Sequence, residues 1–531
     1  MNTKEIIIIV DAVGKKGPFP DTLTKNLAGV PLIQRTINLA LKLTSFSEVY
    51  VMTDSEEVGL ICERNGISIS SLVDLIEMFT SLDKEKNIIS ISPYCPLIND
   101  HEILNALQSY EQTDLNLLLP VKRSTRRVTD KEEDHEKYGT FLKFFQEQSV
   151  LVTLSDFQIF SSELFKNTML NISREKTYFF ELSNESIEIA NPEDWWVCEK
   201  LLNRKRIVFR VIGSETIGMG HIYRALSLAH DITDHEVIFV CDEESEIVVK
   251  KLTGMEYRYE VFKTKDIIEE LINLQPNLVI NDILDTDHVD VHRLQQEGIK
   301  VVNFEDFGSG ATVADLTINE MFDQPVIAGE KILWGREYYF VRDEFFDAKP
   351  HQFNENVESV LITFGGTDQN DLTRKILYKI KSYCENRGIK IYVVAGSGYL
   401  YYEELRKEFA GVDSSVIEIT HATGIISRVM EKTPIAIASN GRTVYELAHM
   451  NIPSIIVPVN DREETHAFAC EENGFVPLKG FREKETPLEV LEALKKLVDN
   501  NRYRKSRYMS TMQFNFSKNK ANVLKKIEEF L

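Results

Sequence analysis

The residue with the clearest potential for chemistry is His221, which follows a glycine-rich turn in the segment Ile217-Gly218-Met219-Gly220-His221-Ile222-Tyr223-Arg224. Gly218 and Gly220 allow the backbone to approach a ligand closely, and the apolar residues that follow predict a helix that begins here. The first N–H groups of a helix have no partner within it and favour a phosphate. An imidazole at this position can accept a proton from water near neutral pH. Taken alone, however, a histidine beside a glycine turn is more often structural or exposed than catalytic.

A second glycine turn, Thr363-Phe364-Gly365-Gly366-Thr367-Asp368, follows another predicted strand and leads into a helical pattern that begins at Leu372. It supplies a second predicted phosphate cradle, with Gly365, Gly366 and Thr367 as the candidate contacts. Two such turns in consecutive lobes predict a ligand that is clamped between them.

A third candidate element runs from Ala438 to Ala448 and brings small and hydroxyl residues to the start of a helix. Arg442 is suited to bidentate contact with a phosphate, and the Glu446 carboxylate is suited to the two hydroxyls of a ribose. A plain capped helix with a solvated Arg and Glu is the alternative interpretation. The other candidate contacts in this element are Ser439, Asn440, Gly441 and Thr443.

The elements that must position these turns are short apolar runs that alternate with helical patterns along the whole chain. This alternation is typical of βα units around parallel sheets, so the predicted fold class is α/β. The predicted strands are Ile6–Val10, Glu48–Met52, Ile207–Val211, Glu236–Cys241, Leu278–Ile280, Lys300–Phe304, Ser359–Phe364, Lys390–Ala395, Ala436–Ala438 and Ser454–Val457.

The chain of 531 residues is too long for one hydrophobic core, and its pattern of elements begins a second time. The basic segment Arg204-Lys205-Arg206 precedes a new strand, glycine turn and helix, which places the main boundary at about residue 204. A weaker break lies between Phe346 and Glu358. The predicted domains are residues 1–204, 205–350 and 351–531.

Composition limits the partners and the compartment. The formal net charge of -22 would repel polyanions, so nucleic acid is an unsuitable partner, whereas a small phosphorylated ligand stays compatible. Six cysteines without a CxxC pair predict buried thiols in a reducing cytoplasm. The apolar run Ile6–Val10 is too short to span a membrane and predicts a buried strand.

The order of motifs between Ile207 and Gly474 resembles the UDP-sugar hydrolase of pseudaminic acid biosynthesis. It resembles more distantly the N-acetylglucosaminyltransferase that makes lipid II, and both have the two-lobed glycosyltransferase-B fold. The segments that carry this resemblance are Ile217 to Arg224, Asn303-Phe304-Glu305-Asp306, Trp334-Gly335-Arg336-Glu337-Tyr338 with Arg342, Phe364-Gly365-Gly366-Thr367-Asp368, and Ser439 to Glu446.

The resemblance implies a UDP group held mainly by the second lobe, with the diphosphate near Gly366 and Thr367 and near the turn Ser439 to Thr443. It places the ribose near Glu446. His221 matches the catalytic histidine of the family, which activates a water for inverting attack on the anomeric carbon. Gly218, Gly220, Arg224 and Asp282 are the remaining substrate-binding candidates, and no metal is expected in this module. The acidic residue that the family usually has soon after the first strand is absent here, where Arg210 is followed by Val211. The resemblance therefore leaves the identity of the sugar open.

Hydrolase and transferase share this scaffold, and the acceptor distinguishes them. A transferase of the lipid II type carries an exposed apolar and basic patch on its first lobe, whereas the segment from Ser227 to Glu246 is acidic here. Water is therefore the favoured acceptor.

The first 200 residues resemble the CMP-sialic acid synthetase group of cytidylyltransferases, which implies a nucleotidyltransferase-like, Rossmann-type domain. The matching segments are Gly14-Lys15-Lys16-Gly17 after the first strand, Lys25-Asn26-Leu27, Gly29 to Ile33, Thr53 to Glu57, Ser92 to Leu97, and Asn191-Pro192-Glu193-Asp194-Trp195. The nucleotide-binding candidates are Gly14, Lys15, Lys25 and Asn26.

The chemistry of this module departs from the resemblance. The first loop, Asp11-Ala12-Val13-Gly14, lacks the arginine of active members, and Glu188 is the one carboxylate where the family has an aspartate pair for magnesium. One carboxylate predicts weak magnesium binding. We therefore expect a degenerate module with a structural, regulatory or weak binding role. The alternative is an active cytidylyltransferase that uses CTP and magnesium, with Lys15, Lys16 and Lys25 at the triphosphate.

The sequence as a whole predicts a cytoplasmic nucleotide-sugar hydrolase that releases UDP and a free 2,4-diacetamido-2,4,6-trideoxyhexose in nonulosonic acid biosynthesis, a route to bacterial surface glycans and flagellin glycosylation. The alternatives are a bifunctional enzyme with an active CMP-nonulosonate synthetase domain, a UDP-sugar-dependent glycosyltransferase, and a non-catalytic nucleotide-sugar-binding scaffold. Oligomerisation through the first domain is also compatible with the resemblance.

Overall fold

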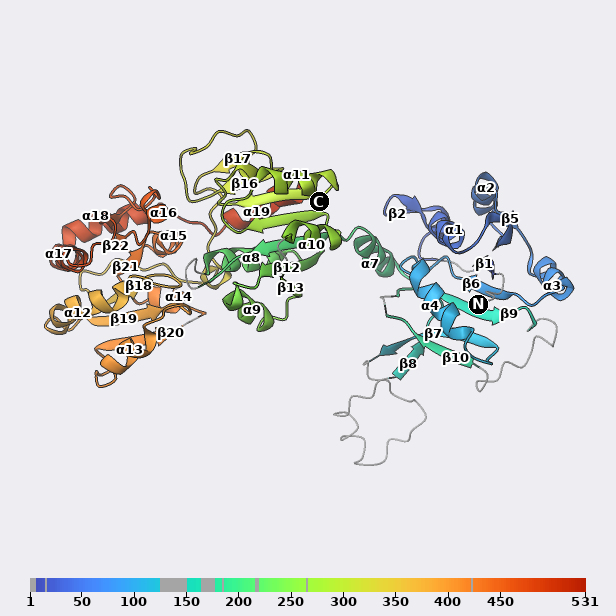
Figure 1. The fold of residues 1–531 in the computed structure, drawn as a ribbon, viewed down its shortest axis with the longest axis horizontal. Coiled ribbons are helices and arrows are strands. Elements are labelled where there is room, and N and C mark those ends of the chain that lie inside the picture. Colours follow the sequence, from blue (N-terminus) through green and yellow to red (C-terminus); the bar gives the residue numbers. More distant parts are fainter. Residues whose placement is uncertain are drawn as a thin grey trace, which may run out of the picture. The chain divides into compact units, whose positions relative to one another are not determined.

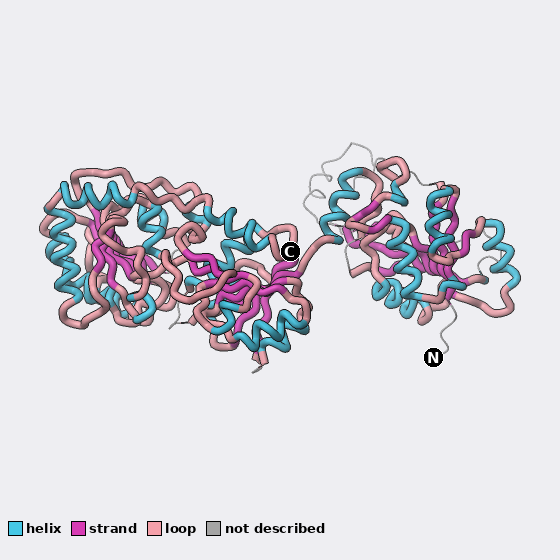
Figure 2. Tube along the Cα trace, turned by 90° about the horizontal axis from the view of Figure 1, so that it is seen from above, coloured by secondary structure: helices cyan, strands magenta, loops and turns pink. Residues whose placement is uncertain are grey.

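The chain forms two compact units, Met1–Arg204 and Lys205–Leu531, in a computed structural model. The structure describes residues 6–14, 17–124, 150–163, 177–183, 186–214, 219–263, 266–421 and 424–531. Each unit has its own sheets, and the second unit has one sheet in each of two lobes (Figure 1). Figure 2 shows strands at the centre of each lobe and helices outside them.

The amino-terminal unit has an eight-stranded mixed sheet in the order β10-β7-β9-β6-β1-β4-β5, with β8 paired to β7. Alternate residues of β1 enter cores on opposite faces: Ile8 packs with helices α1 and α4, and Ile9 packs with α3. Burial on both faces explains why this strand is a continuous apolar run. The strands are β1 Ile6–Ala12, β4 Val49–Thr53, β5 Ser68–Ile69, β6 Asn87–Ile91, β7 Leu117–Ser124, β8 Val150–Thr153, β9 Phe157–Ser161 and β10 Thr177–Glu181, with a small pair β2 Asn26–Leu27 and β3 Val30–Pro31. The helices are α1 Leu32–Leu43, α2 Glu56–Arg64, α3 Leu72–Ser81, α4 Asp100–Tyr110 and α7 Pro192–Leu202.

The first lobe of the second unit has a parallel seven-stranded sheet in the order β13-β12-β11-β14-β15-β16-β17. Phe209 of β11 packs under α8, whereas Val208 packs against α10 and α11 on the other face. The strands are β11 Arg206–Val211, β12 Glu236–Asp242, β13 Tyr259–Phe262, β14 Leu278–Asp282, β15 Lys300–Phe304, β16 Leu316–Asn319 and β17 Ile332–Trp334. The helices are α8 Gly220–Asp231, α9 Glu246–Thr253, α10 Ile267–Asn273 and α11 His288–Gln296.

The second lobe has a parallel six-stranded sheet in the order β20-β19-β18-β21-β22-β23. Ile362 of β18 packs against α12 and α17, and Leu361 faces the α15 side. The strands are β18 Ser359–Thr363, β19 Lys390–Ala395, β20 Ile417–His421, β21 Ala436–Ser439, β22 Ser454–Val457 and β23 Phe475–Pro477. The helices are α12 Leu372–Glu385, α13 Tyr402–Glu408, α14 Ser427–Met430, α15 Thr443–His449, α16 Asp461–Glu464, α17 Thr486–Asp499 and α18 Asn501–Thr511.

The two lobes exchange segments. Helix α19, Asn519–Glu528, belongs by sequence to the predicted second lobe, yet Val523 and Ile527 are buried in the core of the first. Conversely, Tyr339 and Phe345 from the connection before β18 pack in the second lobe. The predicted division into residues 205–350 and 351–531 is therefore wrong for these segments, because the apolar face of each finds its partner in the other lobe.

The α/β fold class is confirmed, and each strand predicted from the sequence is a strand in the structure, with ends that differ by a residue or two. Within the described ranges, every helix is too short or too polar to cross a lipid bilayer. The cysteines are free thiols, and all except the half-buried Cys470 are buried.

Candidate functional site

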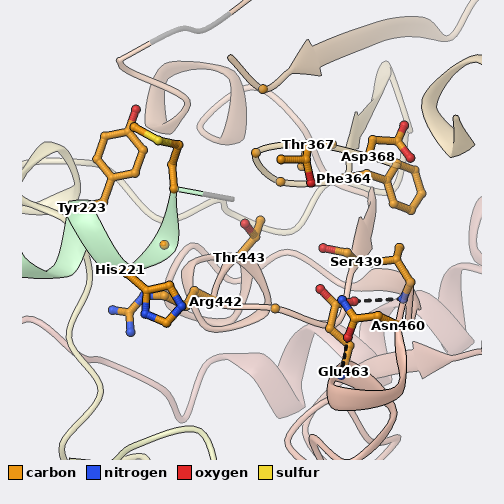
Figure 3. A pocket seen from close by; sticks show the side chains of 18 of the residues that line it. His221, Tyr223, Phe364, Thr367, Asp368, Ser439, Arg442, Thr443, Asn460 and Glu463 are labelled. Atoms are coloured by element: carbon orange, nitrogen blue, oxygen red, sulfur yellow. Dashed lines mark hydrogen bonds between the residues drawn. The ribbon is translucent and has the colours of Figure 1, made fainter. Parts of the chain in front are cut away.

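A cavity of about 450 Å³ opens in the second unit and is lined by residues of both lobes (Figure 3). Its volume is in the range of sites that hold small ligands. Helix α8 supplies one part of the wall, and the turns after β18, β19, β21 and β22 supply others, together with Glu305 and Arg342. The predicted site residues that line it are Gly220, His221, Gly365, Gly366, Thr367, Ser439, Gly441, Arg442, Thr443 and Glu446. Gly218 lies outside the described residues.

His221 stands in the first turn of α8 and is held by a buried carboxylate. Its Nδ1 lies 2.6 Å from Oδ1 of Asp282, the last residue of β14. A carboxylate can only accept, so the proton of the ring is on Nδ1 and Nε2 keeps a lone pair. Burial tends to raise the pKa of Asp282, but the charge of Arg224 and the hydrogen bonds from Arg224 and His221 outweigh it and hold this pKa below its ordinary value. The arrangement gives an oriented base with an ionised partner.

Arg224 differs from its predicted role as a ligand contact. Its side chain is fully buried, and it does not line the cavity. Its Nε donates to Oδ2 of Asp282 at 2.7 Å, and its Nη1 donates to Oε1 of Glu320 at 2.9 Å. Arg224 lies one helical turn after His221, so its side chain points to the same strand ends and locks the Asp282 carboxylate in place.

The turn after β18 is built around close backbone contacts. Gly365 has φ +72°, and a Cβ on Gly396 would lie 2.3 Å from the carbonyl oxygens of Gly365 and Gly366, so only glycine fits at residue 396. The sequence predicted that the start of the nearest helix, α12, is open to a ligand, but in the structure it is not. Its Leu372 and Thr373 N–H groups donate to the Asp368 carboxylate at 2.9 and 2.7 Å. Any phosphate at this turn would meet the loop itself and not the start of a helix.

Asn440 is also placed differently from its predicted role. Its amide donates to the carbonyl oxygens of Glu463 and His466 at 2.7 and 2.9 Å, and it does not line the cavity. Both amide protons are therefore used to fix the loop that contains α16, and this loop brings Arg462 and His466 to the cavity wall.

Arg442 lines the cavity but already has protein partners. It pairs with Glu320 of the first lobe, and its Nη2 donates to the Phe340 carbonyl at 3.2 Å. Its guanidinium lies over the Tyr339 ring, 4.6 Å from the centroid. Burial and the nearby charge of Arg224 lower the pKa of Arg442 to about 10. Glu320 therefore joins Arg224, which lies behind His221, to the arginine predicted for the phosphate.

Glu446, predicted at the ribose, is bound on both carboxylate oxygens by Arg342. The distances are 2.7 Å from Nε and 3.1 Å from Nη2. Both side chains line the cavity, so this pair forms part of its wall. Arg342 lies in the connection before β18, which packs in the second lobe, so its pair with Glu446 holds this connection to α15.

Several cavity residues were missed as site candidates. The sequence indicates Glu305, which follows β15, only as part of a matching segment, and its motifs do not include Arg462, Glu463 or His466. Nδ1 of His466 lies 2.7 Å from the Asn440 carbonyl, and burial lowers the pKa of this imidazole. In Figure 3, Glu463 lies on the side of the pocket opposite His221. The signal that could have found them is their position after predicted strands, because strand ends meet at one edge of a parallel sheet.

The amino-terminal unit has fewer features of a binding site. Gly14, Lys25 and Asn26 are exposed, Gly14 with φ +66°, whereas Lys15 lies outside the described residues. Glu188 accepts a hydrogen bond from the Ser155 hydroxyl. In the part of the chain that the structure describes, no three His, Cys, Asp or Glu side chains gather in a way that could hold a metal ion.

Comparisons with known proteins divide the chain in the same way. The glycosyltransferase family 28 C-terminal domain matches residues 359–526. An uncharacterised protein of Methanocaldococcus jannaschii is 28% identical over 271 residues, 47% of this chain and 54% of that protein, so the chain spans about half of that relative. The CMP-N,N'-diacetyllegionaminic acid synthase of Legionella pneumophila is 24% identical over 236 residues, 38% of this chain and 99% of that protein.

Two solved structures are similar at lower levels. MurG of Acinetobacter baumannii has a TM-score of 0.45 at 12% identity and covers 61% of this chain and 99% of its own. A CMP:2-keto-3-deoxy-manno-octonic acid synthetase complexed with CTP has a TM-score of 0.30 at 15% identity and covers 37% and 98%. The chain thus joins a cytidylyltransferase-like unit to a glycosyltransferase-like unit of the GT-B fold, whose residues 359–526 are similar to the family 28 C-terminal domain.

Proposed function

We propose that the second unit hydrolyses a UDP-linked amino sugar of the 2,4-diacetamido-2,4,6-trideoxyhexose class and releases UDP and the free sugar for nonulosonic acid biosynthesis. The observation that carries the proposal is the pairing of His221 with Asp282 at the wall of the cavity. Nε2 of His221 takes a proton from water, and the water oxygen attacks the anomeric carbon. The bond from that carbon to the diphosphate oxygen breaks, and its electron pair leaves with UDP, which inverts the anomeric centre.

The nucleotide is expected on the second-lobe wall. Gly366, Thr367 and the turn Ser439 to Thr443 bring backbone N–H groups and hydroxyls to the cavity. These donors suit a diphosphate without a metal ion, so we expect hydrolysis to continue in a chelator. Arg442 would contribute to the diphosphate only by sharing or leaving its contact with Glu320.

A UDP-sugar-dependent glycosyltransferase is the second candidate, because the family 28 domain match supports that class. The two differ in the acceptor, and the acidic segment from Ser227 to Glu246 favours water. For the amino-terminal unit we propose a weakened or structural role, with CTP and magnesium bound weakly if at all, and for the protein a cytoplasmic location. A CMP-nonulosonate synthetase activity is the alternative, supported by the similarity to the Legionella synthase.

The test is incubation of the purified chain with a panel of UDP-amino sugars and no acceptor, with the products followed by NMR. We expect UDP and the free sugar to appear, with the first-formed anomer inverted. His221→Ala should reduce kcat by three or more orders of magnitude, a loss in the range for an essential general base, while the affinity for UDP changes little. Absence of UDP release from the whole panel, or full turnover by the variant, would contradict the proposal.

A further inference from the structure

Glu305 has an unusual backbone conformation at the cavity. It follows β15 with φ +50°, in the left-handed region that non-glycine residues rarely adopt. Its N–H donates to the Ile318 carbonyl at 3.0 Å, and its own carbonyl accepts from Nη2 of Arg462 at 2.5 Å. Contacts on both sides therefore maintain the strained conformation, which places Glu305 on the wall that also includes His221. Strain of this kind often gathers at functional sites.

The Glu305 carboxylate is buried, charged and incompletely hydrogen-bonded. The residue is 8% exposed. Its Oε1 lies 3.1 Å from Nη1 of Arg224 but outside hydrogen-bonding geometry, and within the described residues this oxygen has no hydrogen-bond partner. Burial tends to raise the pKa of Glu305, but the charges of Arg224, Arg442 and Arg462 hold it well below its ordinary range. At neutral pH Glu305 is therefore an ionised carboxylate on the cavity wall, and its buried oxygen Oε1 is paired with Arg224 by charge without a hydrogen bond.

The other carboxylates of the cavity wall are engaged. Asp368 caps α12, and Glu446 is bound twice by Arg342. Glu463 accepts from the N–H groups of Val459 and Asn440, and burial raises its pKa. Asp282 lies behind His221 and does not line the cavity. Among the wall carboxylates, Glu305 is the one whose buried oxygen lacks a hydrogen-bond partner in the described structure.

We infer that Glu305 is a second catalytic residue, whose ionised carboxylate contacts the sugar and stabilises the positive charge that develops at the anomeric carbon and ring oxygen. The inference rests on the proposed hydrolysis. In that step His221 takes the water proton and UDP leaves with the electron pair, while Glu305 exchanges no atom and stays a carboxylate. Its charge acts mainly in the transition state, where the sugar is most positive, so it contributes to kcat more than to binding.

The test compares two variants that each remove one buried, arginine-bound carboxylate from the full chain. Glu305→Gln should lower kcat on the order of 100-fold, while KM changes less than about threefold and the rise of kcat with pH stays as in the parent. Glu305→Asp keeps the charge and should recover part of kcat. Glu344→Gln is the matched control, because Glu344 pairs with Arg342 at 2.9 Å but is absent from the cavity wall. It should keep kcat within about threefold.

The possible outcomes separate this inference from the hydrolysis itself. No turnover by the parent chain would overturn both. Turnover by the parent with an undiminished kcat in Glu305→Gln, or with a change in KM alone, would overturn the role of Glu305 and leave the hydrolysis standing. An equal loss of kcat in Glu344→Gln would also overturn it, because the loss would then come from breaking a buried ion pair.

Discussion

Asp282 is the residue on which the geometry of the base depends. It accepts from Nδ1 of His221 and from two nitrogens of Arg224, so both of its oxygens are occupied by donors. Buried carboxylates are costly unless such partners compensate for the lost water. Arg224 thus keeps the Asp282 carboxylate ionised beside the imidazole of His221. Because this carboxylate accepts the proton of Nδ1, the lone pair of the neutral ring is on Nε2.

Replacing this carboxylate with an amide tests the arrangement. In Asp282→Asn a single oxygen must serve Arg224, and the NH2 group then faces Nδ1 of His221, which favours the wrong tautomer. We expect kcat/KM to fall by about two to four orders of magnitude, as when the carboxylate of a Ser-His-Asp triad is lost. UDP affinity, measured by calorimetry, should change little, because Asp282 does not line the cavity. Parent-like turnover would show that the pairing has no part in the reaction.

At the scale of elements, the turns were predictable and their side-chain partners were not. The helix that begins at Gly220 and the strand that ends at Thr363 follow from local periodicity, and both are present. The pairing of Arg442 with Glu320 joins residues 122 positions apart, and nothing local indicates it. The predicted role of Arg224 as a ligand contact was wrong for the same reason, since its partner Asp282 lies at a strand end 58 residues away. Periodicity locates elements, whereas buried charge pairs depend on how the elements pack.

Helix α15 carries a buried histidine that should make stability depend on pH. His449 accepts a hydrogen bond at Nδ1 from the Phe516 N–H at 3.3 Å, and burial lowers its pKa below the ordinary value. As pH falls below about 6.5, the unfolded chain binds this proton before the folded protein does. The stability is therefore complete above that pH and is lost as pH falls toward the folded pKa.

The measurement is the fall in Tm between pH 7.5 and pH 5.5 for the parent and for His449→Gln, which cannot titrate. The fall should be smaller in the variant. Other buried groups with shifted pKa values, such as His466, are the same in both proteins, so the comparison between the two proteins carries the result. An identical fall in both would mean that His449 does not contribute.

At the scale of the whole molecule, the chain has two units with separate cores. The core of the first includes Ile37, and the lobes of the second are tied together by α19 and by the pair that Arg442 makes with Glu320. The second unit should therefore unfold as one body, while the first unfolds independently of it. Each ligand should then stabilise only the unit that binds it.

Calorimetry of the full chain should show two unfolding transitions, of which UDP raises one. At a free concentration of 100 times Kd, the ligand adds about 2.7 kcal/mol to the unit that binds it. Ile37 and Ile437 are both fully buried. Ile37→Ala should destabilise the first unit and Ile437→Ala the second, each by about 2–5 kcal/mol. Each variant therefore identifies the transition that belongs to its own unit. The transition lowered by Ile437→Ala should be the one that UDP raises, while CTP with magnesium moves neither if the first unit is degenerate. A UDP shift of both transitions, or of the one that Ile37→Ala lowers, would contradict this assignment of the nucleotide site.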